Sequence, residues 1–491
     1  MAHSTRFSRP CAALVHLLCF ALPLVTQTAL AAVAISSPSS PPAANANVVY
    51  SNFLGISLEL SFINYYFGNS TDQIPQPVIK YLSALQSRAS GQPVRLRLGG
   101  NSMDSSTYVP SQQEIIQFTN PNANFNDQPV NYGPQLFDVM KGVSSAVGGA
   151  QYLIGLSLRT PNSTNIPLLA GDASKALGDD LDALLLGNDY WTVFGNLQHT
   201  PQGDILSQDK IAGPTICCAW HYPQNNCQGK PQYGLNYYTA HANAVSLARW
   251  QQHGLELIAA SPNRKPILMD EFNSASCGGV DGISNTFAAS LWTADYALQM
   301  ASVGYAGAYL HTRERGITYN LFDPPDAVAG GAGAWTTNPS FYGMLPVAEA
   351  LSSANGSRVV DLNVQNSMSD KSATVAGEKT NIAWGGKTYA GVGDATPVDA
   401  TFSSSLPDKT LSCSGGCTIQ IPGPGLAVVF LGQTFDFSNS SSSSNTTSSS
   451  SPSAPASSNP SNRSGSGASR FSVTGLRLLS ALCVFAIALA L

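Results

Sequence analysis

The stretch Pro266-Ile-Leu-Met-Asp-Glu-Phe-Asn-Ser274 joins a short apolar run to an acidic pair. Proline followed by three apolar residues is typical of a short buried strand, and Asp270 and Glu271 stand at its carboxyl end. A buried strand tolerates ionised side chains poorly, so acids at its end usually face a cleft. In parallel α/β barrels, that end of the strands carries the catalytic groups. The alternative interpretation is an acid that caps the next helix.

Similar apolar runs recur along the first two thirds of the chain, with helical patterns between several of them. The predicted strands are Phe53–Leu60, Val94–Leu98, Tyr152–Leu158, Ala183–Leu186, Ile211–Ile216, Trp220–Tyr222, Ile267–Met269 and Ala306–Leu310. The predicted helices are Pro77–Ser87, Gln135–Val147, Tyr237–His253 and Phe287–Val303. Strands that alternate with helices in this way predict an α/β protein with a (β/α)8 TIM barrel.

The barrel pattern has a gap between its fifth and sixth strands. Only residues 217–219 separate them, whereas parallel neighbours need a crossover of about a dozen residues, usually a helix. Residues 189–210 also carry little helix signal. The sequence therefore predicts a barrel that lacks the helix between strands five and six.

The rest of the chain divides by composition. Residues 1–31 have the basic, apolar and small-residue order of a signal peptide, and residues 32–330 form the predicted barrel. Short β-prone runs without helix patterns predict a β-sandwich over 331–437, to which a strand near Ala32–Ile35 can add. Residues 438–469 are a Ser-rich stretch that cannot bury a core and predicts an O-glycosylated stalk.

The last segment, 470–491, ends in an apolar tail that follows small residues and a polar spacer. This order predicts a glycosylphosphatidylinositol-anchor signal, and a C-terminal transmembrane helix is the alternative. The expected location is therefore outside the cell, secreted and held on the plasma membrane or cell wall by a lipid anchor. The sequons that begin at Asn69, Asn162 and Asn355 would mark exposed surface if they are glycosylated.

Charge and cysteine content exclude several classes of partner. Charged residues make up 11% of the chain and the net charge is −5, which does not suit nucleic acid or anionic membranes. Outside the two terminal signals the chain has six cysteines, an even number that predicts disulfides in an exported protein. These are Cys217, Cys218, Cys227, Cys277, Cys413 and Cys417. Paired metal-ligand spacing is missing, so we expect no metal site. We also expect no cofactor and a monomer.

Several predicted barrel strands end in acids, amides or aromatic residues. Glu59 lies in the first strand, Asn101 follows Gly99-Gly100 after the second, and Tyr222 ends the sixth. A sugar needs many hydrogen-bond partners and a stacking surface, and two carboxylates can cleave a glycosidic bond. We therefore expect a glycan substrate. Arg95 and Arg97 are expected to pair with acids such as Glu59 in the barrel mouth.

The motifs resemble those of glycoside hydrolase family 79, the fungal β-glucuronidase and heparanase-like group with a β-glucuronidase-type C-terminal domain. The resemblance rests on 95–104, 213–218, 221–227, 269–273 and 311–322, and it covers most of residues 33–437. It implies a retaining β-glucuronidase that acts on glucuronic-acid-containing glycans, with Glu271 as the nucleophile. It also implies that Tyr222 and Tyr319 line the sugar subsite and that Asn188 binds the 2-hydroxyl group.

The chain departs from the family at the acid/base position. The family pattern Gly-Asn-Glu-Pro-Asp is here Gly187-Asn188-Asp189-Tyr190, which leaves Asp189 as a weak substitute for the glutamate. Either coding segments have been omitted or the protein is a degenerate member, and both interpretations predict impaired turnover. The alternative functions are a noncatalytic polysaccharide-binding wall glycoprotein and a barrel glycosidase of another sugar specificity.

Overall fold

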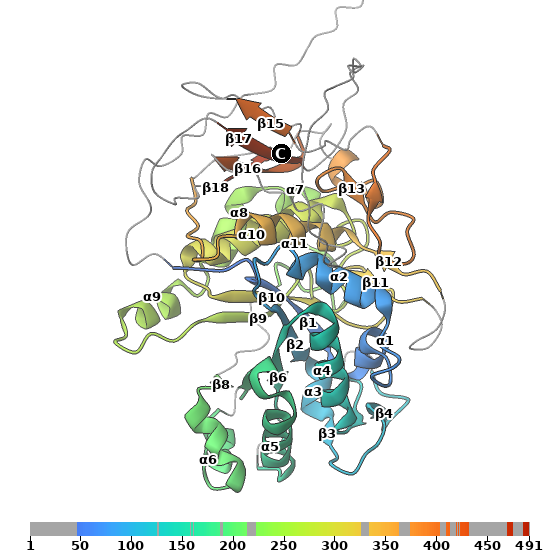
Figure 1. Ribbon diagram of the computed structural model, residues 1–491, viewed down its shortest axis with the longest axis vertical. Helices are drawn as coiled ribbons and strands as arrows, with labels where there is room; N and C mark the ends of the chain where they lie inside the picture. Colours follow the sequence, from blue (N-terminus) through green and yellow to red (C-terminus); the bar gives the residue numbers. More distant parts are fainter. Residues whose placement is uncertain are drawn as a thin grey trace, which may run out of the picture. The chain divides into compact units, whose positions relative to one another are not determined.

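The fold is organised around a parallel sheet of seven strands in the order β8-β7-β6-β2-β1-β10-β9 (Figure 1). Its strands are β1 (Leu54–Glu59), β2 (Val94–Gly99), β6 (Ala150–Gly155), β7 (Leu181–Leu185), β8 (Ile211–Ala212), β9 (Leu268–Phe272) and β10 (Gly307–Thr312). The computed structural model describes residues 47–124, 127–157, 159–160, 162–186, 190–213, 222–325, 333–362, 374–402, 409–412, 419, 421, 423–431, 469–474 and 485–490.

The strand order is that of a barrel. The first strand, β1, pairs with both β2 and β10, the last strand of the series, as it does when a (β/α)8 sheet curls to bring its ends together. Every residue of β1 and β10 is buried, as expected for a parallel sheet covered on both faces. Seven of the eight predicted strands are confirmed, although β8 is shorter than predicted.

The place of the sixth barrel strand, between β8 and β9, holds no strand among the described residues. Tyr222, the last residue of that predicted strand, lies in a bend. The predicted crossover gap, residues 217–219, lies within the range 214–221 that is outside the described residues, so the missing helix stays a prediction.

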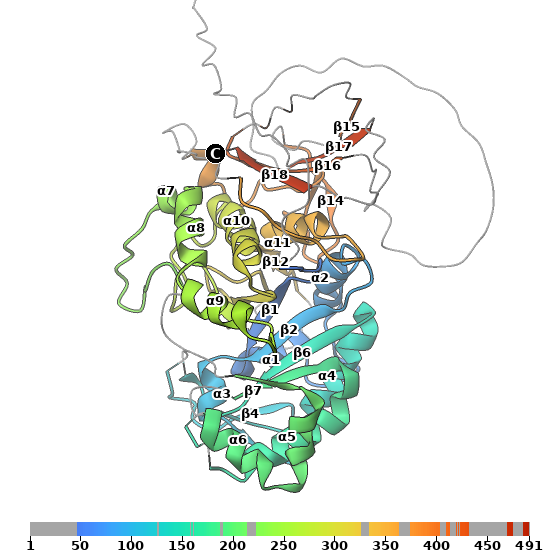
Figure 2. The ribbon, with the colours of Figure 1, turned by 90° about the vertical axis from the view of Figure 1, so that its left-hand side faces the viewer.

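Among the described residues, helices and short 3-10 segments connect and cover the strands (Figures 1 and 2). Helix α2 packs against α4 and α11, α4 against α5, and α10 against α8 and α11. The helices are α1 (Ile63–Phe67), α2 (Gln76–Gln86), α3 (Asn101–Ser105), α4 (Gln135–Val147), α5 (Asn165–Leu177), α6 (Tyr190–Gln198), α7 (Leu235–Tyr238), α8 (His241–Ala248), α9 (Gln252–Ala260), α10 (Phe287–Val303) and α11 (Pro339–Ala350). The 3-10 segments are η1 (Leu60–Phe62), η3 (Gly178–Asp180) and η4 (Pro201–Gln208).

The prediction of little helix between residues 189 and 210 is wrong. Helix α6 and segment η4 fill this range and supply the crossover from β7 to β8. The aromatic, β-branched and glycine residues of α6 have low helix propensity, but Val193 and Leu197 are completely buried. Packing therefore outweighs local preference here.

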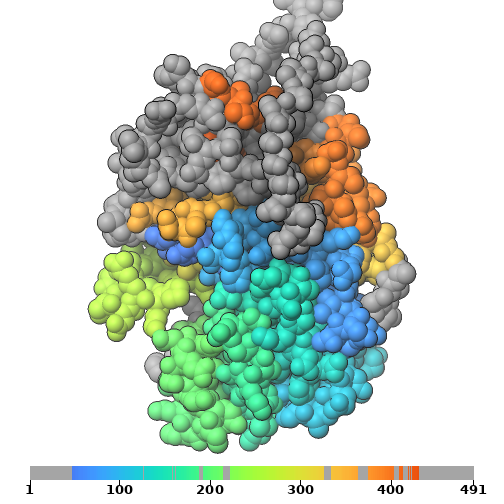
Figure 3. All heavy atoms as spheres, in the orientation of Figure 1, coloured from blue at the N-terminus to red at the C-terminus, as the bar shows by residue number. Residues whose placement is uncertain are grey.

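The helix predicted over Tyr237–His253 is divided into α7, α8 and α9 in the structure. Helix α9 lies at the edge of the molecule, where Figure 3 shows it in yellow-green, and its Leu257 is 60% exposed. The predicted helices over 77–87, 135–147 and 287–303 are confirmed to within one residue as α2, α4 and α10.

Among the described residues after 325, the chain forms short strands and the buried helix α11. Helix α11 packs against α10, α2 and β1, so the range 331–437 that predicts a β-sandwich also contributes a helix to the barrel layer. The described residues belong to one compact unit that spans Ile35–Leu491. The small strands are β3 (Thr107–Tyr108), β4 (Ile116–Phe118), β5 (Val130–Tyr132), β11 (Phe322–Asp323), β12 (Thr336–Thr337), β13 (Lys387–Thr388), β14 (Val398–Asp399), β15 (Lys409–Ser412), β16 (Gly425–Leu431), β17 (Ser469–Thr474) and β18 (Phe485–Ala490).

Strand β16 pairs with β17 and β18, which lie in the segment predicted as an anchor signal. No helix within the described ranges is long and apolar enough to cross a membrane. Most of the predicted stalk and all of residues 1–31 lie outside the described residues, so the stalk, signal peptide and anchor remain predictions.

Candidate active site

A bulge in β9 sets the direction of the acidic pair. Met269 pairs with Ala308 and Phe272 with Leu310, so β9 has one more residue than β10 between these two pairings. Consecutive residues of a regular strand face opposite sides of the sheet, whereas a bulge redirects one of them. The extra residue allows both Asp270 and Glu271 to approach the same guanidinium group.

That guanidinium group belongs to Arg97 on β2. Its Nη1 donates to Glu271 Oε2 at 2.8 Å, and its Nη2 lies 3.8 Å from Asp270 Oδ2. On the other side of the carboxylate, the Tyr222 hydroxyl donates to Glu271 Oε1 at 2.9 Å. Both oxygens of Glu271 therefore accept a hydrogen bond, and the side chain is still 22% exposed.

Charge keeps this arrangement ionised. Burial opposes the charge on Arg97, but the carboxylates of Glu271, Asp270 and Glu59 overcome it and raise the pKa of the guanidinium group. Burial raises the pKa of Tyr222 well above its ordinary value, and the Glu271 carboxylate raises it further. The tyrosine therefore remains a neutral hydroxyl that donates to the Glu271 carboxylate.

A second, fully buried carboxylate lies at the end of β1. Glu59 Oε1 accepts hydrogen bonds from the backbone N–H of Ser102 at 2.9 Å and from its hydroxyl at 2.5 Å. Glu59 Oε2 lies 3.3 Å from His311 Nε2. His311 Nδ1 in turn lies 3.0 Å from the Ser57 hydroxyl, which accepts from Arg97 at 3.0 Å. One polar network thus connects Glu59 to Glu271.

The glycine pair after β2 leaves room for this network. A Cβ on Gly100 would lie 2.2 Å from Glu59 Oε1, and Gly100 has a left-handed φ of 84°. A Cβ on Gly99 would lie 2.7 Å from Arg97 Cζ. Glycine is required at these positions because a larger residue would push the charged groups apart.

Aromatic rings form the wall beside the two carboxylates. The Tyr319 ring lies 6.0 Å from the ring of His311 and 6.4 Å from that of Tyr222. Asn273 donates to the carbonyl oxygens of His311 and Tyr319 and so holds both residues against β9. The structure therefore places Tyr222, Tyr319, Glu59 and Glu271 close together, and their roles at a sugar site stay predictions.

Of the other predicted site residues, the structure describes Asn101 but not Asn188 and Asp189. Asn101 begins α3 and is exposed, next to the network rather than in it. Asn188 and Asp189 lie outside the described residues, so their predicted roles are not tested. In the part of the chain that the structure describes, no group of three or more His, Cys, Asp or Glu residues could hold a metal ion.

One of the predicted disulfides is present. Cys227 and Cys277 are bonded, and the bridge joins the loop after Tyr222 to the loop after β9. The other four candidate cysteines, Cys217, Cys218, Cys413 and Cys417, lie outside the described residues.

Sequence reasoning missed the partner of the nucleophile candidate. It paired Arg97 with acids in the barrel mouth and named Glu59, whereas Arg97 binds Glu271 directly. It also assigned no role to Ser57, His311 or Asn273, all of which face this network. Their positions near the carboxyl ends of β1, β9 and β10 were the available signal.

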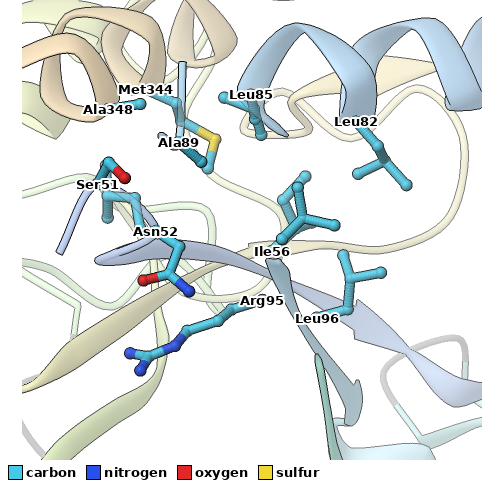
Figure 4. A pocket seen from close by; sticks show the side chains of 12 residues that line it. Ser51, Asn52, Ile56, Leu82, Leu85, Ala89, Arg95, Leu96, Met344 and Ala348 are labelled. Carbon is cyan, nitrogen blue, oxygen red and sulfur yellow. The ribbon is translucent and has the colours of Figure 1, made fainter. Parts of the chain in front are cut away.

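The cavity shown in Figure 4 is separate from the site around Glu271. It is lined mainly by apolar side chains of β1, β2, α2 and α11, including Ile56, Leu82 and Met344. Asn52 and Arg95 mark the amino ends of the strands, away from the carboxyl ends where Glu271 lies. In a barrel enzyme that face serves stability rather than catalysis.

Comparison with known proteins supports the resemblance drawn from the motifs. No family model matches the chain. It is 23% identical over 372 residues to a β-glucuronidase of Aspergillus niger, which covers 63% of this chain and 66% of that protein. It is 34% identical over 93 residues to a β-glucuronidase of Neurospora crassa, or 19% of this chain and 15% of that protein.

A solved structure supports the fold. The crystal structure of a 4-O-α-L-rhamnosyl-β-D-glucuronidase from Fusarium oxysporum matches with a TM-score of 0.52 and 22% identity, over 65% of this chain and 73% of that one. The chain spans slightly less than two thirds of the Aspergillus relative. The chain is therefore similar in sequence to fungal β-glucuronidases and similar in fold to the Fusarium enzyme.

Proposed function

We propose that the protein is a retaining β-glucuronidase-type glycoside hydrolase that acts on glucuronic-acid-containing glycans. The observation that carries the proposal is the Glu271 carboxylate, which is held between the Arg97 guanidinium group and the Tyr222 hydroxyl at 2.8 and 2.9 Å. An ionised, fixed and partly exposed carboxylate is what a glycosidase nucleophile requires.

In the proposed reaction, Glu271 attacks the anomeric carbon and displaces the leaving oxygen. This forms a glycosyl ester that water then hydrolyses, so that two inversions retain the configuration. A second carboxylic acid must protonate the leaving oxygen and later deprotonate the water. Asp189 is the proposed substitute for this group, and Asn188 is proposed to bind the 2-hydroxyl group.

The departure at residues 187–190 favours a second candidate, a noncatalytic polysaccharide-binding protein. The two candidates differ in whether a covalent intermediate forms. An aryl glucuronide with a dinitrophenolate leaving group needs little help from an acid, because this leaving group departs as a stable anion. Glycosylation of Glu271 can therefore be measured even where the acid/base group is weak.

The test is a pre-steady-state assay with dinitrophenyl β-D-glucuronide. We expect a burst of dinitrophenolate, slow turnover, and acceleration by azide with formation of the β-glycosyl azide, since azide needs no base. Glu271→Gln should abolish the burst, a loss on the order of 10⁴-fold or more for a missing nucleophile. Oligosaccharide binding without a burst would select the noncatalytic candidate. A burst only with other aryl glycosides would select a different sugar specificity.

We also propose that the protein is exported and held at the cell surface. The Cys227–Cys277 disulfide supports export, because such bonds persist in oxidising compartments. Phosphatidylinositol-specific phospholipase C should release the protein from intact cells. Protein that stays bound after this treatment but is extracted by detergent would favour a transmembrane tail instead.

A further inference from the structure

We propose that Gln224 and the Cys227–Cys277 disulfide are positioning groups that hold the Tyr222 hydroxyl on the nucleophile. This inference rests on the proposed function and extends it to the loop that carries Tyr222. Two segments are involved: the tyrosine loop, residues 222–234, and the β9 loop, residues 273–279. The tyrosine loop begins at Tyr222, and the β9 loop begins two residues after Glu271. The contacts between the two loops therefore control the distance between these two side chains.

Gln224 is the centre of the tyrosine loop. It is 3% exposed, and its amide group donates to the Tyr238 hydroxyl at 2.7 Å and to the Tyr233 carbonyl at 3.3 Å. Its side-chain oxygen accepts from the backbone N–H groups of Gln232 and Tyr233 at 2.7 and 3.0 Å. Two donors and two acceptor positions are all that a glutamine side chain offers, and all are used. The side chain therefore has one fixed orientation.

Two further hydrogen bonds join the two loops directly, and a third connects the β9 loop to Tyr238 on α7. The backbone N–H of Ser276 donates to the Gln224 carbonyl at 3.1 Å. The Asn226 amide group donates to the Gly279 carbonyl at 2.7 Å. Tyr238, which receives the Gln224 hydrogen bond, donates to the Ser274 carbonyl. The loop that carries Tyr222 is therefore attached along the β9 loop by separate contacts.

The disulfide closes this attachment. Cys277 adopts a left-handed φ of 56°, a conformation that non-glycine residues rarely take and that persists only where the surrounding structure imposes it. Cys277 itself forms the bridge to Cys227, and the hydrogen bond from Asn226 to Gly279 follows two residues later. This unusual backbone conformation lies in the loop that follows β9, the strand that carries Glu271. It indicates that the contacts around Cys277 hold the loop in one conformation.

The critical test asks whether Gln224 acts through Tyr222. The probe is 2-deoxy-2-fluoro-β-D-glucuronyl fluoride, whose covalent attachment to Glu271 is followed by intact-protein mass spectrometry. Gln224→Met keeps the size of the side chain and removes its hydrogen bonds. We expect about ten- to hundredfold slower labelling, the scale of a misplaced catalytic contact. In the Tyr222→Phe background, the same change should have no further effect.

A purely structural role would give a different pattern. If the effects of Gln224→Met and Tyr222→Phe multiply, or if Gln224→Met labels at the wild-type rate, the proposal is overturned. Arg88→Met is the matched control, because it breaks a buried ion pair between the segment after α2 and Glu349 on α11, elements outside both loops. This control should lower stability and leave the labelling rate unchanged.

A second measurement needs no substrate and separates failure of this inference from failure of the proposed function. Cys227→Ser/Cys277→Ser should increase hydrogen exchange in both loops and leave exchange in α4 and α5 unchanged. If the wild-type protein is not labelled but the double variant shows this increase, the function fails while the attachment holds. Unchanged exchange in both loops would overturn the inference whatever the labelling result.

Discussion

Replacing His241 with glutamine should change how the stability of the protein depends on pH. His241 begins α8, and its Nδ1 lies 2.9 Å from Asp295 Oδ1 on α10, while its Nε2 lies 3.3 Å from Asp361 Oδ1. The side chain is 14% exposed. The Asp295 hydrogen bond, opposed by burial and reinforced by Asp361, raises the pKa of His241 from 6.5 to about 9.

The magnitude follows from this shift. Each pKa unit corresponds to 1.36 kcal/mol, so the charged imidazole contributes at most about 3 kcal/mol. Because the folded-state pKa lies above the unfolded value, this stabilisation is complete below pH 6.5 and disappears as the pH rises through about 9. Burial raises the pKa of Asp295, which costs stability once that carboxylate ionises and reduces the net gain of the pair.

The assay is urea denaturation followed by circular dichroism at pH values from about 6 to 10. The free energy of unfolding of the wild type should exceed that of His241→Gln by up to about 3 kcal/mol at the acid end, and the difference should vanish at the alkaline end. Lys80→Met is the control, since Lys80 pairs with Asp394 on the exposed surface and such pairs contribute less than about 1 kcal/mol. A His241 difference that does not depend on pH would refute the reasoning.

Three further changes test the network around the nucleophile. Gly100→Ala places a Cβ 2.2 Å from Glu59 Oε1 at a φ of 84°, and we expect a loss of at least about 2 kcal/mol in the free energy of unfolding. Gly91→Ala is the control, because Gly91 has a similar φ of 82° but its Cβ would meet nothing within 4 Å, and it should lower the free energy of unfolding by about 1 kcal/mol. Equal losses for the two variants would argue against crowding of Glu59 by the new Cβ. Glu59→Gln replaces the buried carboxylate that accepts two hydrogen bonds from Ser102 and should cost about 2 kcal/mol in urea denaturation, whereas no loss would show that this carboxylate does not stabilise the fold. Tyr222→Phe removes one hydrogen bond to the Glu271 carboxylate and should slow labelling by the fluoroglucuronyl probe about tenfold or more, unless that bond is not made in solution.

The barrel could be predicted from sequence because its strands are short apolar runs that end in polar residues. Residues 267–269 and 306–310 show this pattern, and they overlap β9 and β10 of the parallel sheet. Helix α11 could not be predicted in the same way. It is buried on all sides and contains Pro346, so it has neither the amphipathic period nor the composition that indicates a helix. Its packing against α10 stabilises it.

The site was predictable in part for a related reason. Glu271, Tyr222 and Tyr319 stand in motifs that a family resemblance can transfer residue by residue. The pairing of Arg97 with Glu271 depends on the bulge in β9, which changes the side to which an acid points. The bulge could not be predicted from Met269-Asp-Glu-Phe272 alone. A bulge is an extra residue relative to the neighbouring strand, so it can be recognised only once the pairing of the two strands is known.

The pairing of β1 with β10 also determines when the site can exist during synthesis. Ser57 and His311, which meet in the polar network, are 254 residues apart in the chain, and Arg97 and Glu271 are 174 apart. At about 5 to 20 residues per second, a ribosome needs roughly half a minute to make the segment between Ser57 and His311. During that time the segments of β1 and β2 lack the neighbours that complete the sheet, and their apolar side chains are open to wrong partners. Arg97 is therefore synthesised well before Glu271. Until the second half of the barrel has been made, its guanidinium group lacks the carboxylate that it binds in the folded protein.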